Sequence, residues 1–169
     1  MELKTLNEIE IISAPHSKIS EVDFENLTFG NVFTDHMLVC DYVDGAWHKP
    51  VIEPYAPFMI DPSAKVFHYG QAIFEGMKAY KDEQDDVWLF RPDENYHRFN
   101  KSATRMAMPE VPEDIFLGGL HRLLEIEKEW VKKGKGNTLY IRPFMIATGH
   151  GVIAAPSQEY RFMIILSPA

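Results

Sequence analysis

The sequence predicts an α+β fold of two layers, in which an antiparallel sheet carries helices packed on one face. Three observations indicate this fold. Short apolar runs occur in pairs around turn-forming residues, which is the pattern of β-hairpins. Two consecutive segments in the middle of the chain instead repeat apolar residues every three or four positions, as amphipathic helices do. Apolar strands follow them, and one sheet with both helices on one face is the simplest arrangement of these elements.

The composition is that of a compact globular protein. With 169 residues, 46% of them hydrophobic, the chain is long enough for one or at most two domains with a buried core. Its formal net charge is −8, and no basic run carries interleaved aromatic residues, so we expect no nucleic-acid partner. The single cysteine, Cys40, indicates a reducing compartment. No run approaches the roughly 18 to 20 apolar residues of a membrane span, so we expect a cytoplasmic protein that does not bind a membrane.

Two hairpins are predicted in the first half of the chain. Residues 1–24 are polar and are expected to form an N-terminal extension to a domain that covers residues 25–169. The strands HMLVCDYV and WHKPVIEPY flank Asp44 and Gly45, a dipeptide that supplies the positive φ angles of a tight turn. A second pair, MKAYK and VWLFR, flanks the acidic turn 82–86.

Two helices are predicted next. The first begins at Pro92 and ends near Pro109. Its apolar face consists of Tyr96, Phe99, Ala103 and Met106. The second begins at Pro112, and we expect its last turn to carry Lys132 and Lys133 before an αL cap at Gly134. Its buried stripe consists of Phe116, Leu120, Leu123, Leu124, Trp130 and Val131.

Two strands, TLYIRPFMIATG and YRFMIILSPA, close the sequence and are joined by the loop HGVIAAPSQ. Tyr140 and Arg142 lie two positions apart on the first of these strands, so their side chains leave the same face. A hydroxyl and a guanidinium above apolar neighbours can bind a carboxylate. The alternative is a half-buried arginine that pairs with an internal acid. Because the chain ends at Ala169 directly after an apolar strand, we expect it to be part of a longer protein.

The stretch FHYGQAIFEGMKAY, residues 67–80, combines glycines with aromatic residues. We expect a short helical turn over QAIFE between Gly70 and Gly76, with Tyr69 and Phe74 projecting into a shared space. These rings can line a pocket or fill a core. Lys78 is expected to be an ordinary surface lysine, because nothing near it in the sequence lowers the pKa of its amine.

The polar face of the first predicted helix carries Arg98, Ser102 and Arg105, a pattern typical of a solvated face. The seven histidines show no metal-ligand spacing, and no metal is expected. The residues alone therefore leave the function of Arg98 open.

Four blocks of the sequence resemble consecutive blocks of the branched-chain amino acid aminotransferases. They are LTFGNVFTDHML (27–38), HYGQAIFEGMKAY (68–80), LFRPDENYHRFNKSATRM (89–106) and LYIRPFMIATG (139–149). Four long blocks in order make a specific signal. The resemblance implies the D-amino acid aminotransferase-like fold, also called fold type IV, with this chain as the smaller N-terminal domain. It further implies a homodimer that holds pyridoxal 5'-phosphate between the smaller and larger domains.

The resemblance also implies roles for individual residues. Arg98 would bind the cofactor phosphate, and Arg142 would bind the anionic group of glutamate or 2-oxoglutarate. The wall of the pocket for the substrate side chain would consist of Phe29, Tyr69, Phe74 and Tyr140, with Tyr69 reaching across the dimer. Val152 and Ala154 would contact substrate from the loop between the last two strands, although relatives commonly carry a leucine, glycine, valine run where this chain has Val152, Ile153 and Ala154.

The implied function is transfer of an amino group from leucine, isoleucine or valine to 2-oxoglutarate, which belongs to branched-chain amino acid biosynthesis. The lysine that binds the cofactor in this family lies beyond the given sequence, so we expect no catalytic residue here and no activity of this chain alone. Two alternatives remain. One is another enzyme of the same fold, a D-amino acid aminotransferase or an aminodeoxychorismate lyase, and the other is a non-catalytic module that binds carboxylates.

Overall fold

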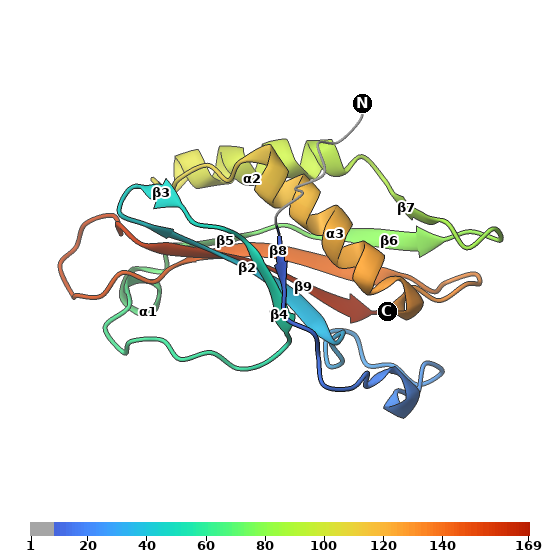
Figure 1. The fold of residues 1–169 in the computed structure, drawn as a ribbon. Coiled ribbons are helices and arrows are strands. Elements are labelled where there is room, and N and C mark those ends of the chain that lie inside the picture. The colour runs from blue at the N-terminus through green and yellow to red at the C-terminus, as the bar shows by residue number, and fades with distance from the viewer. Residues whose placement is uncertain (1–8) are drawn as a thin grey trace.

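The computed structural model describes residues 9–169, which form one nine-stranded sheet with two longer helical segments on one face (Figure 1). The strand order is β1-β4-β2-β9-β8-β6-β7, with β3 paired to β2 and β5 paired to β8. Neighbouring strands are antiparallel except β1 and β4. The predicted α+β fold, an antiparallel sheet with helices on one face, is confirmed apart from this one parallel pair at the edge.

The first predicted hairpin is confirmed. It consists of β2 (His36–Val43), β3 (Ala46–Trp47) and β4 (Val51–Pro54). Asp44 and Gly45 have φ angles of 53° and 79°, as a tight turn with two positive φ angles requires. Part of the predicted extension 1–24 also joins the sheet, because β1 (Glu10–Ile11) pairs with β4, and a short 3₁₀ turn, η1 (Ile19–Glu21), follows. Residues 1–8 of that extension lie outside the described part.

The remaining predicted strands are also confirmed. The second hairpin consists of β6 (Met77–Lys81) and β7 (Val87–Leu89). The last two strands are β8 (Leu139–Ala147) and β9 (Tyr160–Pro168), which pair along their whole length. Side chains along β8 alternate between buried and half-buried, which places its odd-numbered residues toward the helices and its even-numbered residues on the other face.

The prediction of a helical turn over QAIFE is wrong. The helix α1 (Lys65–Tyr69) comes before Gly70, whose φ angle of 62° ends it in the left-handed conformation. The next residues are extended instead, in β5 (Ala72–Phe74), because β8 offers them backbone partners from Phe144 to Ile146. The sheet therefore overrides a local pattern of glycines that fits a turn equally well.

The first predicted helix is α2 (Pro92–Arg105), which begins and ends close to the expected positions. One residue of its predicted apolar face, Met106, follows the helix and is 37% exposed. The buried polar residue of α2 is Asn100, whose amide bonds both the N–H and the carbonyl of Val111 at 2.9 Å. Asn100 thus fastens α2 to the segment that leads into the next helix.

The second predicted helix is shorter than expected. It consists of a π-helical turn, η2 (Asp114–Gly118), the helix α3 (Gly119–Ile126) and a 3₁₀ turn, η3 (Lys128–Trp130). The expected last turn with Lys132 and Lys133 is wrong, because Val131 is already extended. The buried stripe is confirmed, since all its members are buried: Phe116, Leu120, Leu123, Leu124, Trp130 and Val131.

A buried polar group explains where α3 ends. Glu127, only 2% exposed, accepts hydrogen bonds from His36 and from the backbone N–H of Asp35. The Asp35 carboxylate in turn accepts from the indole of Trp130 at 3.1 Å and from the hydroxyl of Ser17 at 2.5 Å. These contacts fix the residues after α3 against the start of β2, so the helix cannot continue.

The core lies between the sheet and the helices. Phe99 of α2, Phe116 of η2 and Phe162 of β9 are fully buried, with ring centroids 5.3 to 5.5 Å apart. Cys40 is buried beside them, and burial raises the pKa of its thiol to about 12, so the thiol is protonated and unreactive at neutral pH. Among residues 9–169, no helix has the length and apolar character needed to cross a bilayer.

Candidate active-site half

The face of the sheet opposite α2 and α3 presents Arg142 against aromatic rings. Nε and Nη2 of Arg142 donate to the hydroxyl oxygen of Tyr140 at 3.1 and 2.7 Å. The guanidinium carbon also lies 4.1 Å from the centre of the Phe74 ring, within the range of a cation–π contact. The partner of Arg142 here is thus a hydroxyl and an aromatic face, and not the internal acid of the alternative interpretation.

Phe29 completes this aromatic group. Its ring meets the Tyr140 ring edge-on, with the centroids 5.0 Å apart. Phe29 and Phe74 are 60% and 62% exposed, so they wall an open surface and do not fill the core. The structure therefore brings together four of the predicted site residues, which we call the aromatic wall: Phe29, Phe74, Tyr140 and Arg142.

Gly76 gives the Tyr140 hydroxyl its space. An ideal Cβ on Gly76 would lie 2.5 Å from Tyr140 Oη, a distance that no stable contact allows. The φ angle of Gly76 lies outside the left-handed region, so the residue is needed for close approach and not for backbone freedom. Sequence reasoning assigned this glycine only to a turn.

Arg98 lies on α2 and reaches the connection between β5 and β6. Its Nε and Nη2 donate to the two carboxylate oxygens of Glu75 at 2.5 and 2.7 Å. The Arg98 side chain is nevertheless 67% exposed, whereas Glu75 is 6% exposed. With Gly76 and Lys78, Arg98 lines an open hollow of about 450 Å³, which we call the edge hollow. Sequence reasoning missed Glu75, because nothing near it in the sequence indicates that a helix returns to it.

The other predicted site residues form a second group around α1. The Tyr69 hydroxyl donates to the carbonyl of Val152, and Lys65 Nζ donates to the carbonyl of Ala155 at 2.7 Å. The loop between β8 and β9 is thus held against α1, while the Val152 side chain is 66% exposed and Ala154 is exposed too. The Tyr69 side chain thus joins α1 to the backbone of this loop through its hydroxyl, and the loop residues Val152 and Ala154 are exposed.

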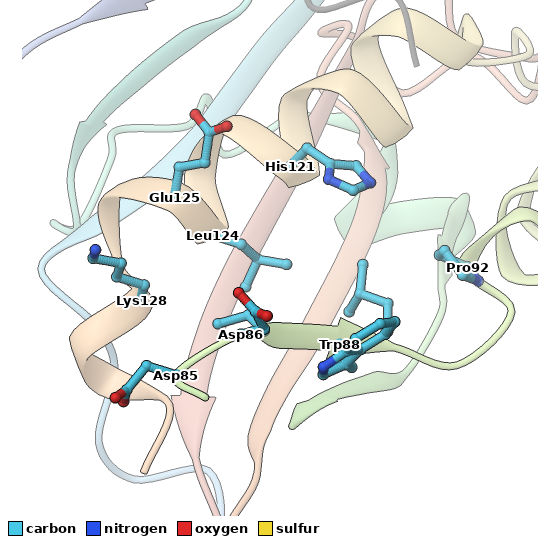
Figure 2. A pocket seen from close by; sticks show the side chains of 10 residues that line it. Asp85, Asp86, Trp88, Pro92, His121, Leu124, Glu125 and Lys128 are labelled. Carbon is cyan, nitrogen blue, oxygen red and sulfur yellow. The ribbon is translucent and has the colours of Figure 1, made fainter. Parts of the chain in front are cut away.

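Another hollow, of about 480 Å³, lies between the β6–β7 hairpin and α3 (Figure 2). Figure 2 shows Leu124 and His121 on the α3 side of it and Trp88 on the hairpin side, with Asp86 between the two elements and the Glu125 carboxylate directed away from Trp88. None of the predicted site residues lines this hollow. Among residues 9–169, no three histidine, cysteine or acidic side chains lie together as a metal site would need.

Relatives of similar sequence are named as branched-chain-amino-acid transaminases or aminotransferases. The chain is 54% identical over 147 residues to branched-chain-amino-acid transaminase 1 of Bacillus subtilis, a match that covers 86% of this chain and 41% of the relative. It is 51% identical over 148 residues to a probable branched-chain-amino-acid aminotransferase of Staphylococcus epidermidis, again with 87% and 41% covered. The chain thus spans about two-fifths of the length of these relatives. No model of a protein family matches it.

Solved structures share the fold. The branched-chain aminotransferase of Thermoproteus uzoniensis with norvaline matches with a TM-score of 0.57 at 19% identity, over 79% of this chain and 41% of that one. The enzyme of Thermobaculum terrenum in its PLP form matches with a TM-score of 0.56 at 19% identity, over 78% and 40%. At this identity the likeness concerns the fold alone. The chain is thus similar over most of its length to branched-chain-amino-acid aminotransferases, and it shares the fold of solved ones.

Proposed function

We propose that the protein of which this chain is a part transfers amino groups from leucine, isoleucine or valine to 2-oxoglutarate, with pyridoxal 5'-phosphate as cofactor. In this proposal residues 25–169 are the smaller N-terminal domain, residues 1–24 are an extension to it, and a larger domain supplies the lysine that binds the cofactor. The observation that carries the proposal is the aromatic wall, which joins apolar surface to one guanidinium.

The aromatic wall suits two substrates that differ in side-chain charge. An arginine has five N–H groups, and Arg142 donates two of them to Tyr140, so others remain for the carboxylate of glutamate. When leucine occupies the same place, Arg142 keeps its contacts with Tyr140 and Phe74 and is not left as an unpaired charge. The rings of Phe29 and Phe74 meanwhile offer an apolar surface to a branched aliphatic chain.

The edge hollow suits the phosphate of the cofactor. Arg98 is held on one edge by a buried acid but stays largely exposed, so its charge can bind an external anion. Gly76 connects this hollow to the aromatic wall, because it lines the first and adjoins Tyr140 of the second. The cofactor, when bound, supplies the electron sink for the exchange of an amino group. This chain contributes phosphate binding and a substrate surface.

Tyr69, Val152 and Ala154 fit a role in a homodimer. They are exposed, and the hydrogen bond from the Tyr69 hydroxyl to the Val152 carbonyl joins α1 to the loop that carries Val152 and Ala154. We therefore place them against substrate in the second copy of a homodimer, which works in the cytoplasm in branched-chain amino acid biosynthesis.

The full-length protein tests this function. Loaded with pyridoxal 5'-phosphate, it should convert leucine and 2-oxoglutarate to glutamate, while this chain alone should not. Competition among leucine, D-alanine and aminodeoxychorismate separates it from other enzymes of the same fold. No glutamate from leucine in the loaded protein, or a preference for either competitor, would overturn the proposal.

A further inference from the structure

Glu75 is a buried acid that contacts Arg98, and the proposed function assigns it no part in the binding of substrate or cofactor. It follows β5, and its backbone N–H donates to the carbonyl of Pro143 at 2.9 Å. Its neighbours in the chain belong to the site, because Phe74 contacts Arg142 and Gly76 adjoins Tyr140. Glu75 points the other way, toward α2, so this short segment touches both arginines of the site.

Both oxygens of the Glu75 carboxylate accept hydrogen bonds. Besides the two N–H groups of Arg98, it accepts from the Asn95 amide at 3.0 Å and from the backbone N–H of Gly76 at 3.3 Å. Burial alone would raise the pKa of Glu75, but the hydrogen bonds from Arg98 and Asn95 outweigh it and hold the pKa below its usual value. The carboxylate is therefore ionised at neutral pH.

We propose that Glu75 is a positioning residue for the anion site at Arg98, which rests on the proposed role of Arg98 in binding the cofactor phosphate. An arginine side chain that is 67% exposed would otherwise sample many rotamers. The two-point contact through Nε and Nη2 fixes the plane of the guanidinium and leaves Nη1 outside this contact. The phosphate then meets a guanidinium that is already ordered, which strengthens binding.

Glu75 also has an opposite effect on an anion, because its own negative charge repels a phosphate. The positive charge of Arg98 offsets this repulsion, because its guanidinium is bound directly to the Glu75 carboxylate, whereas nothing replaces the lost order of the Arg98 side chain when that carboxylate is removed. Removal of the Glu75 charge therefore weakens phosphate binding. If repulsion were the larger effect, the same substitution would tighten it, so the sign of the change decides between the two.

The chain offers a matched control. Glu94 lines the same edge hollow but is 57% exposed and pairs with Arg91 at 2.9 Å, and Arg98 is not its partner. Glu94→Gln removes one negative charge from the rim and leaves the guanidinium of Arg98 in place. It reports the effect of a lost rim charge, together with the release of Arg91, without a change in the contact between Arg98 and Glu75.

The experiment uses the cofactor-free full-length protein, with dissociation constants for pyridoxal 5'-phosphate and for pyridoxal, which lacks the phosphate, measured by fluorescence quenching. Glu75→Gln should weaken pyridoxal 5'-phosphate binding about tenfold and change pyridoxal binding less than about twofold. Glu94→Gln should leave both unchanged or bind the phosphate form slightly more tightly. If Glu75→Gln does not fold, Asn95→Ala, which removes one of the three hydrogen-bond donors to Glu75 Oε2, should give a smaller loss that is again confined to the phosphate form.

Two results would overturn the role of Glu75. One is pyridoxal 5'-phosphate binding that is unchanged or tighter in Glu75→Gln. The other is an equal loss for both ligands, which indicates a purely structural role. Arg98→Gln is measured alongside, since unchanged binding of pyridoxal 5'-phosphate in that variant would instead refute the phosphate role of Arg98, on which the proposal rests.

Discussion

The Tyr140 hydroxyl occupies the place where a side chain on residue 76 would begin, because an ideal Cβ on Gly76 would lie 2.5 Å from Tyr140 Oη. The same hydroxyl accepts both hydrogen bonds that orient Arg142. A methyl group added at residue 76 would therefore displace the Tyr140 hydroxyl and, with it, the guanidinium of Arg142.

Gly76→Ala should displace Tyr140 and destabilise the chain by about 1 to 3 kcal/mol, the usual cost of an overpacked site. It should also slow the half-reaction with glutamate in the full-length protein, because Arg142 loses its anchor. Urea unfolding and single-turnover kinetics measure the two effects. The double variant Gly76→Ala/Tyr140→Phe should regain part of the stability, since the closest atom is the hydroxyl oxygen; no recovery would contradict the contact.

Phe74→Ala should separate substrate binding from stability. Because the Phe74 ring is 62% exposed, its loss should cost less than about 1 kcal/mol of unfolding free energy. Leucine turnover by the full-length protein should fall, because one ring of the aromatic wall is removed. Phe162→Ala is the control, since that ring is fully buried and its loss should cost about 3 to 5 kcal/mol. Equal destabilisation by both variants would show that Phe74 belongs to the core.

The sequence predicted those features that depend on residues only a few positions apart in the chain. Tyr140 and Arg142 share a face because side chains alternate along a strand, and the structure joins them by hydrogen bonds. The Asp44–Gly45 turn and the buried stripe of the second helical segment were predictable for the same reason, since each depends on residues within a few positions of one another.

The features that sequence reasoning missed depend on distant partners. Glu75 meets Arg98 across 23 positions, and Glu127 meets His36 across 91 positions and ends α3 early. The QAIFE segment is a strand because β8 lies beside it. In each case a contact that no local pattern indicates overrides propensity.

Asp35→Asn should change how stability depends on pH. Burial would raise the pKa of Asp35, but hydrogen bonds from the Lys18 N–H, Ser17 and Trp130 lower it below its usual value of 3.8. The Asp35 carboxyl therefore binds a proton more readily in the unfolded chain than in the folded one. The stabilisation of the fold by the ionised Asp35 is complete above pH 3.8 and is lost as the pH falls through the folded pKa. Urea unfolding of this chain at pH 7 and at pH 3 measures it: the cost of Asp35→Asn should be larger at pH 7, and an equal cost at both would contradict the shift.

Arg98→Ala should weaken retention of pyridoxal 5'-phosphate by the full-length protein, because a charge-assisted hydrogen bond contributes roughly 1.5 to 3 kcal/mol. Release of the cofactor during dialysis, followed by absorbance, measures the change. Arg105→Ala is the matched control, since Arg105 is an exposed arginine on the same helix. If both variants retain the cofactor equally well, the phosphate binds elsewhere.

Arg142→Met should distinguish the two proposed substrates of the full-length protein. Methionine keeps an unbranched apolar side chain over the Phe74 ring but removes the charge, so the surface offered to leucine is largely kept. The carboxylate of glutamate loses a charge-assisted contact, which corresponds to a fall in kcat/KM of about 10- to 150-fold. Each half-reaction is followed separately by the absorbance change of the cofactor. Lys78→Met is the comparison: it removes an equal charge beside Tyr140, and because Lys78 lines the edge hollow, any loss should be the same in both half-reactions. If Arg142→Met slows both half-reactions to the same extent, then the guanidinium orders the wall without recognising the carboxylate, and the two substrates are told apart elsewhere in the protein.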